Sequence, residues 1–386
     1  MITLKKEYKL DNLLFYLGYI PLLLVSILKT STINSSSAFE TFVRIVAVIS
    51  IVILCCKGMI DLYSFKNFIF TLLFLIILIL TWRISGENFV LFLFVPVIFS
   101  KGINPQNINR VFFVICMLSI TIIMILSLKG VIPNLTYVRG NIVRNSFGII
   151  YPTDFAAYIF YLVCSYIYMR REHYSFIEVM VIILIAYIVY LKTNARLDYI
   201  CTILAAIFCY LVRFNWVKKM MERVKLFFPM VPAVIILILT YFYNSGSSFF
   251  VKIDELLSER LSIVAPMFKE YGIKPFGNKI YQNGLGGASG QNFNFMVDKY
   301  TFIDSAYLRL ILMYGFIITL LILIYLTYQL SYINDEFLVS ILIVVFISST
   351  VEMHMLQVAY NPFFIMLAVE YFKRKPGQSS ISKIVL

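Results

Sequence analysis

Long apolar runs separated by short polar turns occupy most of this chain. A run of roughly 20 apolar residues is typical of a helix that crosses a bilayer. The pattern predicts about twelve such helices, of which 88–100 and 337–350 are short enough to be tilted, re-entrant or wrongly bounded. The predicted runs are 12–29, 41–56, 67–82, 88–100, 110–128, 153–169, 176–192, 196–212, 226–243, 303–329, 337–350 and 356–372.

One long hydrophilic passage, residues 244–300, interrupts this alternation. Within it, apolar residues recur at helical spacing over 250–268, with charged residues between them. That period predicts an amphipathic helix on a membrane surface or over the mouth of a bundle, kinked at Pro266. The following segment is rich in Gly and Asn and suits a loop that surrounds a polar ligand. A disordered connector is the alternative, and the helical period argues against it.

Composition settles the class of protein. The 386 residues are 61% hydrophobic and 14% charged, with a mean hydropathy of +0.88. Average soluble proteins are nearer half apolar and a quarter charged. We therefore expect an all-α integral membrane protein with one polytopic domain, residues 1–386, and an extracytoplasmic cap loop at 244–300. The net charge of +13 indicates topology and contact with membrane lipid headgroups, and no nucleic-acid partner is expected.

Lys and Arg in the short loops predict the orientation of the chain. With the N-terminus inside, Lys5, Lys6 and Lys9 lie in the cytoplasm, as does the dense basic segment 213–225. The longer loops 129–152 and 244–300 then lie outside. This arrangement predicts a multi-pass protein of the cell membrane with both termini cytoplasmic.

The first of four polar clusters follows the fifth apolar run. Arg139 and Arg144 precede a helix that Pro152 helps to start, and Tyr151 lies between them and that helix. Arginines beside a helix N-terminus favour a phosphate ligand. The arginines are alternatively contacts to headgroups or signals of topology, and Asp154 in the first turn is either a helix cap or part of the site.

The second cluster is a tight turn in which Arg196 and Asp198 open the eighth run. Charges at that position are costly unless they pair or face a wet cavity, so they are candidates for function. A structural ion pair with a neighbouring helix is the alternative.

The remaining two clusters complete the same predicted outer face. Arg260 lies on the amphipathic helix, Asp304 opens the tenth run, and Glu352 and His354 lie in the turn before the last run. A single histidine at a membrane edge is more often structural, so Glu352 is the stronger candidate. Charges of both signs gathered at one mouth indicate a binding or catalytic site.

The same residues resemble the Wzy-type polysaccharide polymerases of the O-antigen polymerase and ligase superfamily. Three short motifs carry the resemblance: Arg144-x-Ser146-x-Gly148-x-x-x-Pro152, Thr193-x-Ala195-Arg196, and Ile303-Asp304-Ser305-x-Tyr307 followed by Gly315. The ligases have a histidine near the end of the large loop, where this chain has Asp304, and this difference favours a polymerase.

The resemblance implies a metal-independent glycosyltransferase that uses no cofactor and acts on the outer face of a bacterial membrane. Its partners would be lipid-linked oligosaccharides on undecaprenyl pyrophosphate, with a flippase and a chain-length regulator as protein partners. No metal-ligand spacing or nucleotide motif occurs in the sequence. All six cysteines lie in apolar runs, where small buried side chains are expected.

We assign provisional roles on this basis. Arg144, Arg196 and Arg260 would hold the pyrophosphate, with Arg139 and Asp198 in the substrate site, and Asp304 or Glu352 would be the base or its orienter. The residues expected to line the sugar groove are Tyr151, Tyr281, Asn292 and Asn294.

Three other functions remain open. A flippase or transporter also fits many spans and intramembrane charges, although such proteins usually show related halves and broken helices. An O-antigen-like ligase would pass the glycan to a different acceptor without lengthening it. A scaffold without catalytic activity is the third alternative.

Overall fold

The structure is a computed structural model that describes residues 2–33, 36–60, 65–294 and 299–374. Positions 295–298 of the predicted cap and residues 375–386 lie outside the described residues. Helices dominate the described chain. They are α1 (Ile2–Lys29), α2 (Ser37–Ile60), α3 (Phe65–Ser85), α4 (Phe89–Ile98), α5 (Pro105–Leu128), α6 (Pro152–Arg170), α7 (Phe176–Thr193), α8 (Arg196–Leu211), α9 (Asn215–Val224), α10 (Val231–Tyr241), α11 (Ser248–Leu256), α12 (Arg260–Tyr271), α13 (Gly287–Gln291), α14 (Ala306–Arg309), α15 (Phe316–Ser331), α16 (Glu336–Ser348) and α17 (Phe363–Arg374).

Five helices among the described residues are long and apolar enough to cross a membrane. They are Leu10–Lys29, Ser37–Ile60, Phe68–Ser85, Pro105–Leu128 and Phe176–Thr193. Shorter apolar helices are also present, among them α4, which packs against α2 and α3, and α16, which packs against α8. A helix of ten residues such as α4 rises only about 15 Å, half the thickness of a bilayer core. All the predicted apolar runs contain helix.

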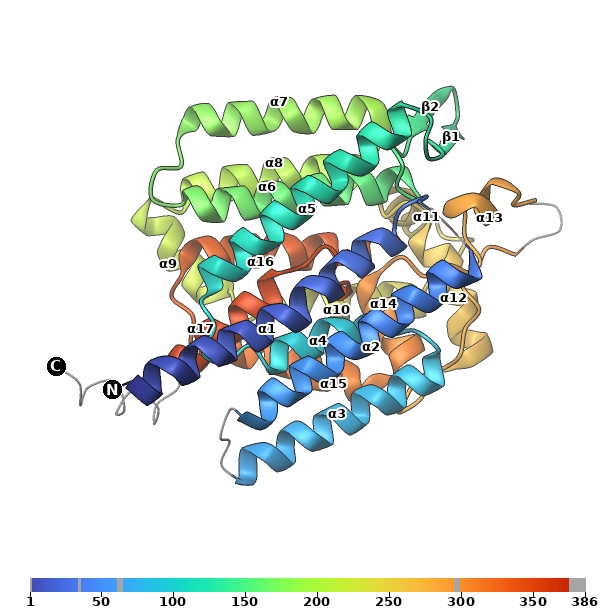
Figure 1. Ribbon diagram of the computed structural model, residues 1–386. Coiled ribbons are helices and arrows are strands. Elements are labelled where there is room, and N and C mark those ends of the chain that lie inside the picture. Colours follow the sequence, from blue (N-terminus) through green and yellow to red (C-terminus); the bar gives the residue numbers. More distant parts are fainter. Residues whose placement is uncertain (1, 34–35, 61–64, 295–298, 375–386) are drawn as a thin grey trace.

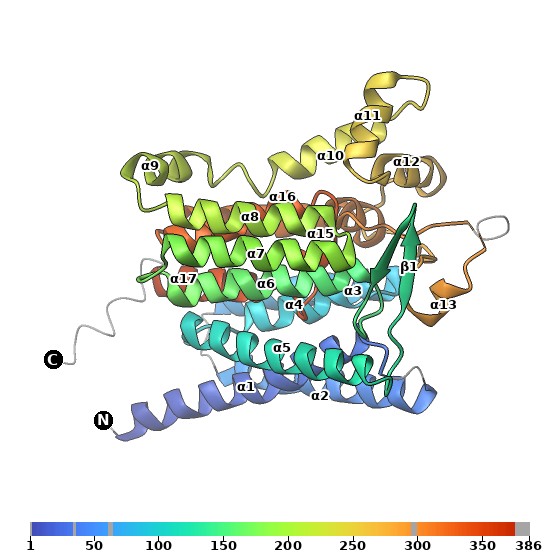
Figure 2. The ribbon, with the colours of Figure 1, turned by 90° about the horizontal axis from the view of Figure 1, so that it is seen from above.

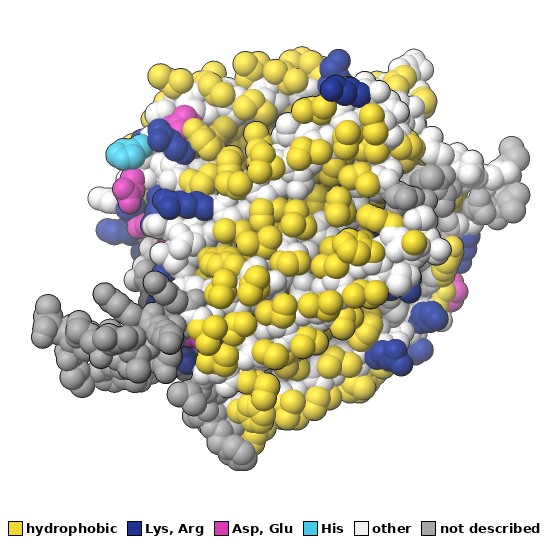
Figure 3. Space-filling model, viewed as in Figure 1, with side chains coloured by type: hydrophobic (Ala, Val, Ile, Leu, Met, Phe, Trp, Pro, Cys, Tyr) yellow, Lys and Arg dark blue, Asp and Glu magenta, His cyan; other side chains and the backbone are white. Residues whose placement is uncertain are grey.

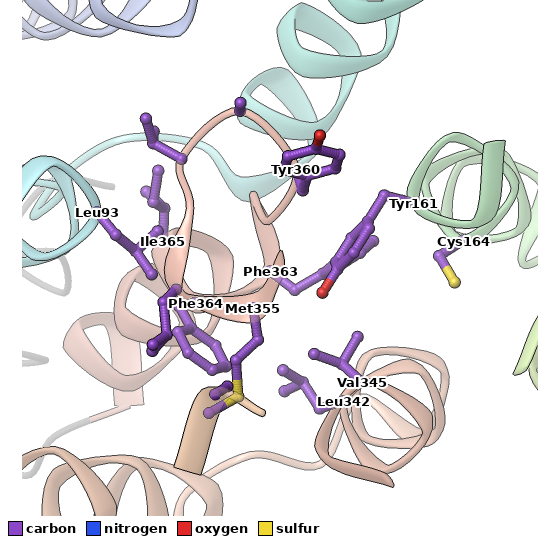
Figure 4. Packing of buried hydrophobic residues seen from close by; sticks show 14 of the residues in the cluster. Leu93, Tyr161, Cys164, Leu342, Val345, Met355, Tyr360, Phe363, Phe364 and Ile365 are labelled. Atoms are coloured by element: carbon purple, nitrogen blue, oxygen red, sulfur yellow. The ribbon is translucent and has the colours of Figure 1, made fainter. Parts of the chain in front are cut away.

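Side chains are distributed as expected for a protein surrounded by hydrocarbon. Apolar side chains cover the middle of the face seen in Figure 3, and charged ones gather toward its two ends. Val48 on α2 and Leu73 on α3 are more than half exposed. The interior is equally apolar, and 363–369 on α17 are fully buried against α4 and α5 (Figure 4). This distribution supports a helical membrane protein.

The polar elements gather at one end of the bundle. The hairpin of β1 (Thr136–Arg139) and β2 (Ile142–Asn145) lies there together with α11, α12 and α13 (Figures 1 and 2). We call it the cap end. Helix α1 begins and helix α17 ends at the opposite end. The hairpin was not predicted, because two strands of four residues carry too short a pattern.

The prediction of one amphipathic helix kinked at Pro266 is wrong. The segment forms two helices, α11 and α12, and Pro266 lies inside the second. The chain breaks at Ser258 and Glu259, which adopt left-handed backbone angles, φ 56° and 64°. Asp254 stabilises the break, because its Oδ1 accepts hydrogen bonds from the backbone of Leu261 at 2.7 Å and of Ser262 at 3.3 Å.

An amphipathic helix also occurs at the other end of the bundle. Helix α9 buries Val217 and Met221 and exposes Trp216 together with Lys219. The basic segment 213–225, which the sequence predicts to be cytoplasmic, therefore includes a helix of the kind that lies along a membrane interface.

The cap loop docks into an interruption of the tenth apolar run. That run forms α14, a π-helical turn η1 (Leu310–Tyr314), Gly315 at φ 94° and α15. The backbone of Phe316 and Ile317 donates to the carbonyls of Lys274 and Pro275, at 3.1 and 3.2 Å. The loop and the broken helix meet at two glycines, since a Cβ on Gly315 would lie 2.3 Å from the Gly277 nitrogen.

This contact predicts the effect of Gly315→Ala. Gly315 has φ 94° and ψ 164°, a region that essentially only glycine adopts, so alanine there costs about 1–3 kcal/mol and must also displace the loop backbone. Gly272→Ala is the matched control, since Gly272 has similar angles, φ 64° and ψ 169°, but nothing within 4 Å of its Cβ position. We expect Gly315→Ala to lower the midpoint of thermal unfolding clearly more than Gly272→Ala, measured by intrinsic fluorescence in detergent. Equal shifts would contradict the docking described above.

Candidate functional site

Three arginines from separate parts of the chain line one cavity at the cap end. Arg139, Arg144 and Arg260 all border a space of about 580 Å³, which we call the arginine cavity. Tyr151 and Tyr300 complete much of its wall. The hairpin, the start of α6, the start of α12 and the segment before α14 supply these side chains, so the cavity exists only when the cap is docked.

Arg144 is the most enclosed of the three. It lies on β2 opposite Tyr137, and Gly140 at φ 59° suits the first position of a tight hairpin turn. Its side chain is only 4% exposed, and its Nε donates to the Thr193 carbonyl at 2.7 Å. The guanidinium carbon lies 5.3 Å from the centre of the Tyr151 ring.

One donor of Arg144 is left without a partner. Its Nη2 is buried and makes no hydrogen bond to the described residues. A buried charged donor is costly to leave unsatisfied, and a ligand oxygen in the cavity would satisfy it. The arrangement therefore favours an anionic ligand.

Arg260 is placed by the break between the two cap helices. It is the first residue of α12, directly after the left-handed Glu259, which also lines the cavity. Its Nη1 forms an ion pair with Asp304 Oδ2, and its Nε is buried without a partner among the described residues. Burial alone would lower the pKa of Arg260, but Asp304 raises it, so the guanidinium stays charged.

Asp304 lies just behind the arginine cavity. The Tyr300 hydroxyl, which borders the cavity, donates to its Oδ2 at 3.3 Å. Burial raises the pKa of Asp304, and Arg260 opposes this shift. Asp304 is thus a carboxylate of increased basicity, and only Tyr300 lies between it and the cavity.

Arg139 and Arg196 add positive charge at the margin. Reduced hydration and repulsion from Arg144, Arg196 and Arg260 lower the pKa of Arg139. Arg196, the first residue of α8, has an exposed side chain and does not line the cavity. The structure therefore brings Arg139, Arg144 and Arg260 together. Arg196 stays outside the cavity, where its charge adds to the positive electrostatic potential.

A histidine held by carboxylates lies deeper in the bundle. His354 Nδ1 is 3.1 Å from Glu352 Oε2, and its Nε2 is 3.1 Å from Asp154 Oδ1. Asp198, which is 3% exposed, interacts electrostatically with both Glu352 and His354. The turn before α17 and the starts of α6 and α8 thus meet in one cluster.

The carboxylates determine the charge of His354. Burial would lower its pKa, but the hydrogen bonds that the ring donates to Asp154 and Glu352 raise it to about 10. The ring is therefore a cation at neutral pH, and it orients the two carboxylates instead of acting as a base. The sequence predicts a structural role for His354 and either a cap or a site role for Asp154, and the structure pairs the two side chains directly.

A second buried ion pair was missed entirely. Arg309 is fully buried, and its Nη1 contacts the Glu87 carboxylate oxygens at 2.8 and 2.6 Å. Its Nη2 donates to Gln282 Oε1 at 2.8 Å, and its Nε donates to the Ile303 carbonyl at 2.7 Å. A cation inside the tenth apolar run was the signal that could have identified it.

The predicted sugar-groove residues do not share one place. Tyr151 lines the arginine cavity, whereas Tyr281 is 80% exposed and lies outside it. Asn292 and Asn294 are exposed and also lie outside the lining, which their neighbours Gln291 and Phe293 join instead. Within the described residues, no group of three or more His, Cys, Asp or Glu side chains is placed to hold a metal ion.

The pKa of His354 predicts a pH-dependent stability. Because the folded pKa of about 10 exceeds the ordinary 6.5, the charged ring stabilises fully below pH 6.5, and this is lost as pH rises toward 10. The gap in thermal midpoint between the wild type and His354→Gln should therefore be widest at low pH and should narrow as pH rises. His173→Gln, at an exposed position, is the control and should show no such trend. A gap that widens with pH would contradict the assignment.

The chain matched none of the models of known protein families, none of the curated proteins and none of the solved structures with which it was compared. Its function must therefore be argued from the geometry of this site.

Proposed function

We propose that the protein is a Wzy-type polymerase that joins lipid-linked oligosaccharide repeat units on the outer face of the cytoplasmic membrane. The donor is a glycan on undecaprenyl pyrophosphate, and the acceptor is a repeat unit on a second such lipid. The observation that carries the proposal is the arginine cavity, in which three guanidinium groups surround one space at the cap end.

Pyrophosphate is the ligand that best suits these arginines. Guanidinium groups bind phosphate oxygens through paired, charge-assisted hydrogen bonds. The buried Nη2 of Arg144 and the buried Nε of Arg260 are donors that a phosphate oxygen would satisfy. As the bond from sugar C1 to the phosphate oxygen breaks, charge builds on the leaving pyrophosphate, and preorganised cations stabilise that charge.

A carboxylate completes the reaction. The acceptor hydroxyl gives its proton to a base as its oxygen bonds to C1, and undecaprenyl pyrophosphate leaves. We assign the base to Asp304, because burial makes it more basic and Tyr300 connects it to the cavity. Glu352 and Asp198, held around the charged His354, then orient the substrate and balance charge.

The proposal includes a topology of about twelve membrane segments with the cap outside and both termini inside. The apolar belt of Figure 3 and the placement of the hairpin, α11, α12 and α13 at one end support it. Short helices such as α4 would be shielded from lipid by longer ones, as its nearly complete burial allows.

A lipid-linked oligosaccharide flippase is the second candidate. The break at Gly315 after a π-helical turn favours it, because transporters use discontinuous helices at their binding sites. Here the break contacts the cap loop near one end, and the uncompensated charges gather at that end. This placement supports the polymerase better.

The topology predicts which positions a membrane-impermeant maleimide can reach. Tyr281 is an exposed cap position. In intact cells, the Tyr281→Cys variant should be labelled more strongly than the parent protein, whose own cysteines give the background. In His173→Cys, at the opposite end, label should be gained only after permeabilisation. The reverse pattern would invert the protein and remove the site from the outer face.

The chemistry predicts the effect of Arg144→Ala. Removing one preorganised donor to a developing negative charge costs about 100-fold or more in rate. Purified wild-type protein incubated with lipid-linked repeat units from the native host should form a polymer ladder, which Arg144→Ala should largely lose. Arg144→Lys should recover part of the rate, because it keeps the charge without the paired donors.

Arg83→Ala is the matched control, since Arg83 is exposed at the end of α3 and outside the arginine cavity. It should form the wild-type ladder. A wild-type rate in Arg144→Ala at equal protein would remove Arg144 from the mechanism. Transbilayer movement of intact repeats without new linkages would favour the flippase, and transfer to another acceptor without lengthening would indicate a ligase.

A further inference from the structure

A second cavity lies beside the carboxylate and histidine cluster. It occupies about 200 Å³ between α1, the start of α4, the start of α6 and the segment before α17. We call it the second cavity. Its size is below the roughly 300–1,000 Å³ typical of sites for drug-sized ligands, which limits it to a small ligand or to one unit of a larger one.

The charges around the second cavity balance. Arg309 and Glu87 both border it, and they are already paired with each other. Lys29 and Asp154 contribute one further charge of each sign. The arginine cavity, in contrast, is bordered by three arginines and one carboxylate, Glu259. A site favours a ligand whose charge complements its own. The second cavity therefore suits an uncharged ligand, and the arginine cavity suits an anion.

The lining combines aromatic faces with a few hydrogen-bonding groups. Phe92, Phe302 and Tyr360 present ring surface, and Asn88 and Gln357 present amides. A sugar ring has an apolar C–H face and a polar hydroxyl edge, so it requires both kinds of surface at once. An apolar site with a few placed polar groups fixes such a ligand in one orientation.

Neighbouring residues at the start of α6 border the two cavities. Tyr151 and Thr153 border the arginine cavity, whereas the next residue, Asp154, borders the second. His354, 3.1 Å away from Asp154 Oδ1, holds that carboxylate in place. We propose that the second cavity binds one uncharged sugar residue and that Asp154 accepts a hydrogen bond from its hydroxyl. If the protein is the proposed polymerase, this sugar belongs to the acceptor, and that assignment rests on the proposed function. The binding of a sugar in the second cavity does not depend on it.

The test measures sugar binding directly. The protein is reconstituted in lipid nanodiscs without sugar detergents, and saturation-transfer NMR is recorded with the methyl glycosides of glucose, galactose and N-acetylglucosamine. We expect a signal for at least one glycoside. Asp154→Asn should weaken that binding by about tenfold or more, because a hydrogen bond to a charged group is lost. Ser26→Phe, which fills the cavity, should abolish it.

Leu24→Phe is the matched control, because it makes the same kind of change on the exposed side of α1 and should bind as the wild type does. If Ser26→Phe does not fold, Asn88→Leu at the cavity wall takes its place, and it should likewise lose glycoside binding. Inorganic pyrophosphate, followed by phosphorus NMR, should still bind to Ser26→Phe and Asn88→Leu through the arginine cavity.

The outcomes separate this inference from the proposed function. Glycoside binding that is lost in the cavity variants but kept in Leu24→Phe supports the sugar site, even if no polymer ladder forms with lipid-linked repeats. Absence of any glycoside signal in the wild type overturns it, and so does a signal unchanged in both Ser26→Phe and Asn88→Leu, even if the ladder forms.

Discussion

The arrangement of the cap end depends on the pairing of one buried cation. Arg309 lies inside an apolar helical run with no exposed surface, where an unpaired guanidinium would be very costly. Glu87, Gln282 and the Ile303 carbonyl satisfy it, and they come from the start of α4, the cap loop and the entry to α14. Satisfying this one charge therefore fixes three segments relative to one another, and Asp304 follows directly after one of them.

The buried arginines differ in how completely the protein neutralises them. Arg309 has a full carboxylate and two further acceptors, and Arg260 has the Asp304 carboxylate but an Nε with no partner in the described part of the chain. Arg144 has a carbonyl, an aromatic face and an unpartnered Nη2 among the described residues. Charge compensation thus decreases toward the arginine cavity. Since folding gains nothing from an unsatisfied buried cation, the residual charge is best explained by a ligand that supplies the missing acceptors.

The sequence was informative where an apolar pattern is long or where a charged residue stands at a position that costs free energy. Apolar runs predicted the helical segments, and the cost of charge at a membrane edge pointed to Arg144, Arg260 and Asp304, which the structure places around or beside one cavity. It failed where tertiary contacts decide. Nothing local indicates that the chain breaks at Ser258, because Asp254 and the docked helices impose that conformation. Likewise, nothing near Glu87 in the sequence shows that it pairs with a buried cation, because its partner Arg309 is far away in the sequence.

The left-handed pair at Ser258 and Glu259 shows how local strain is used to position the site. Such angles cost free energy in residues other than glycine, so they persist only where surrounding contacts enforce them. Here the break turns the start of α12 toward the hairpin and brings Arg260 to the cavity wall facing Tyr151 and Arg144. A continuous helix through this segment would carry Arg260 away from the hairpin, because the axis of α12 would follow that of α11. The strain at the break is therefore the structural cost of placing a second buried guanidinium on the cavity that Arg144 already borders.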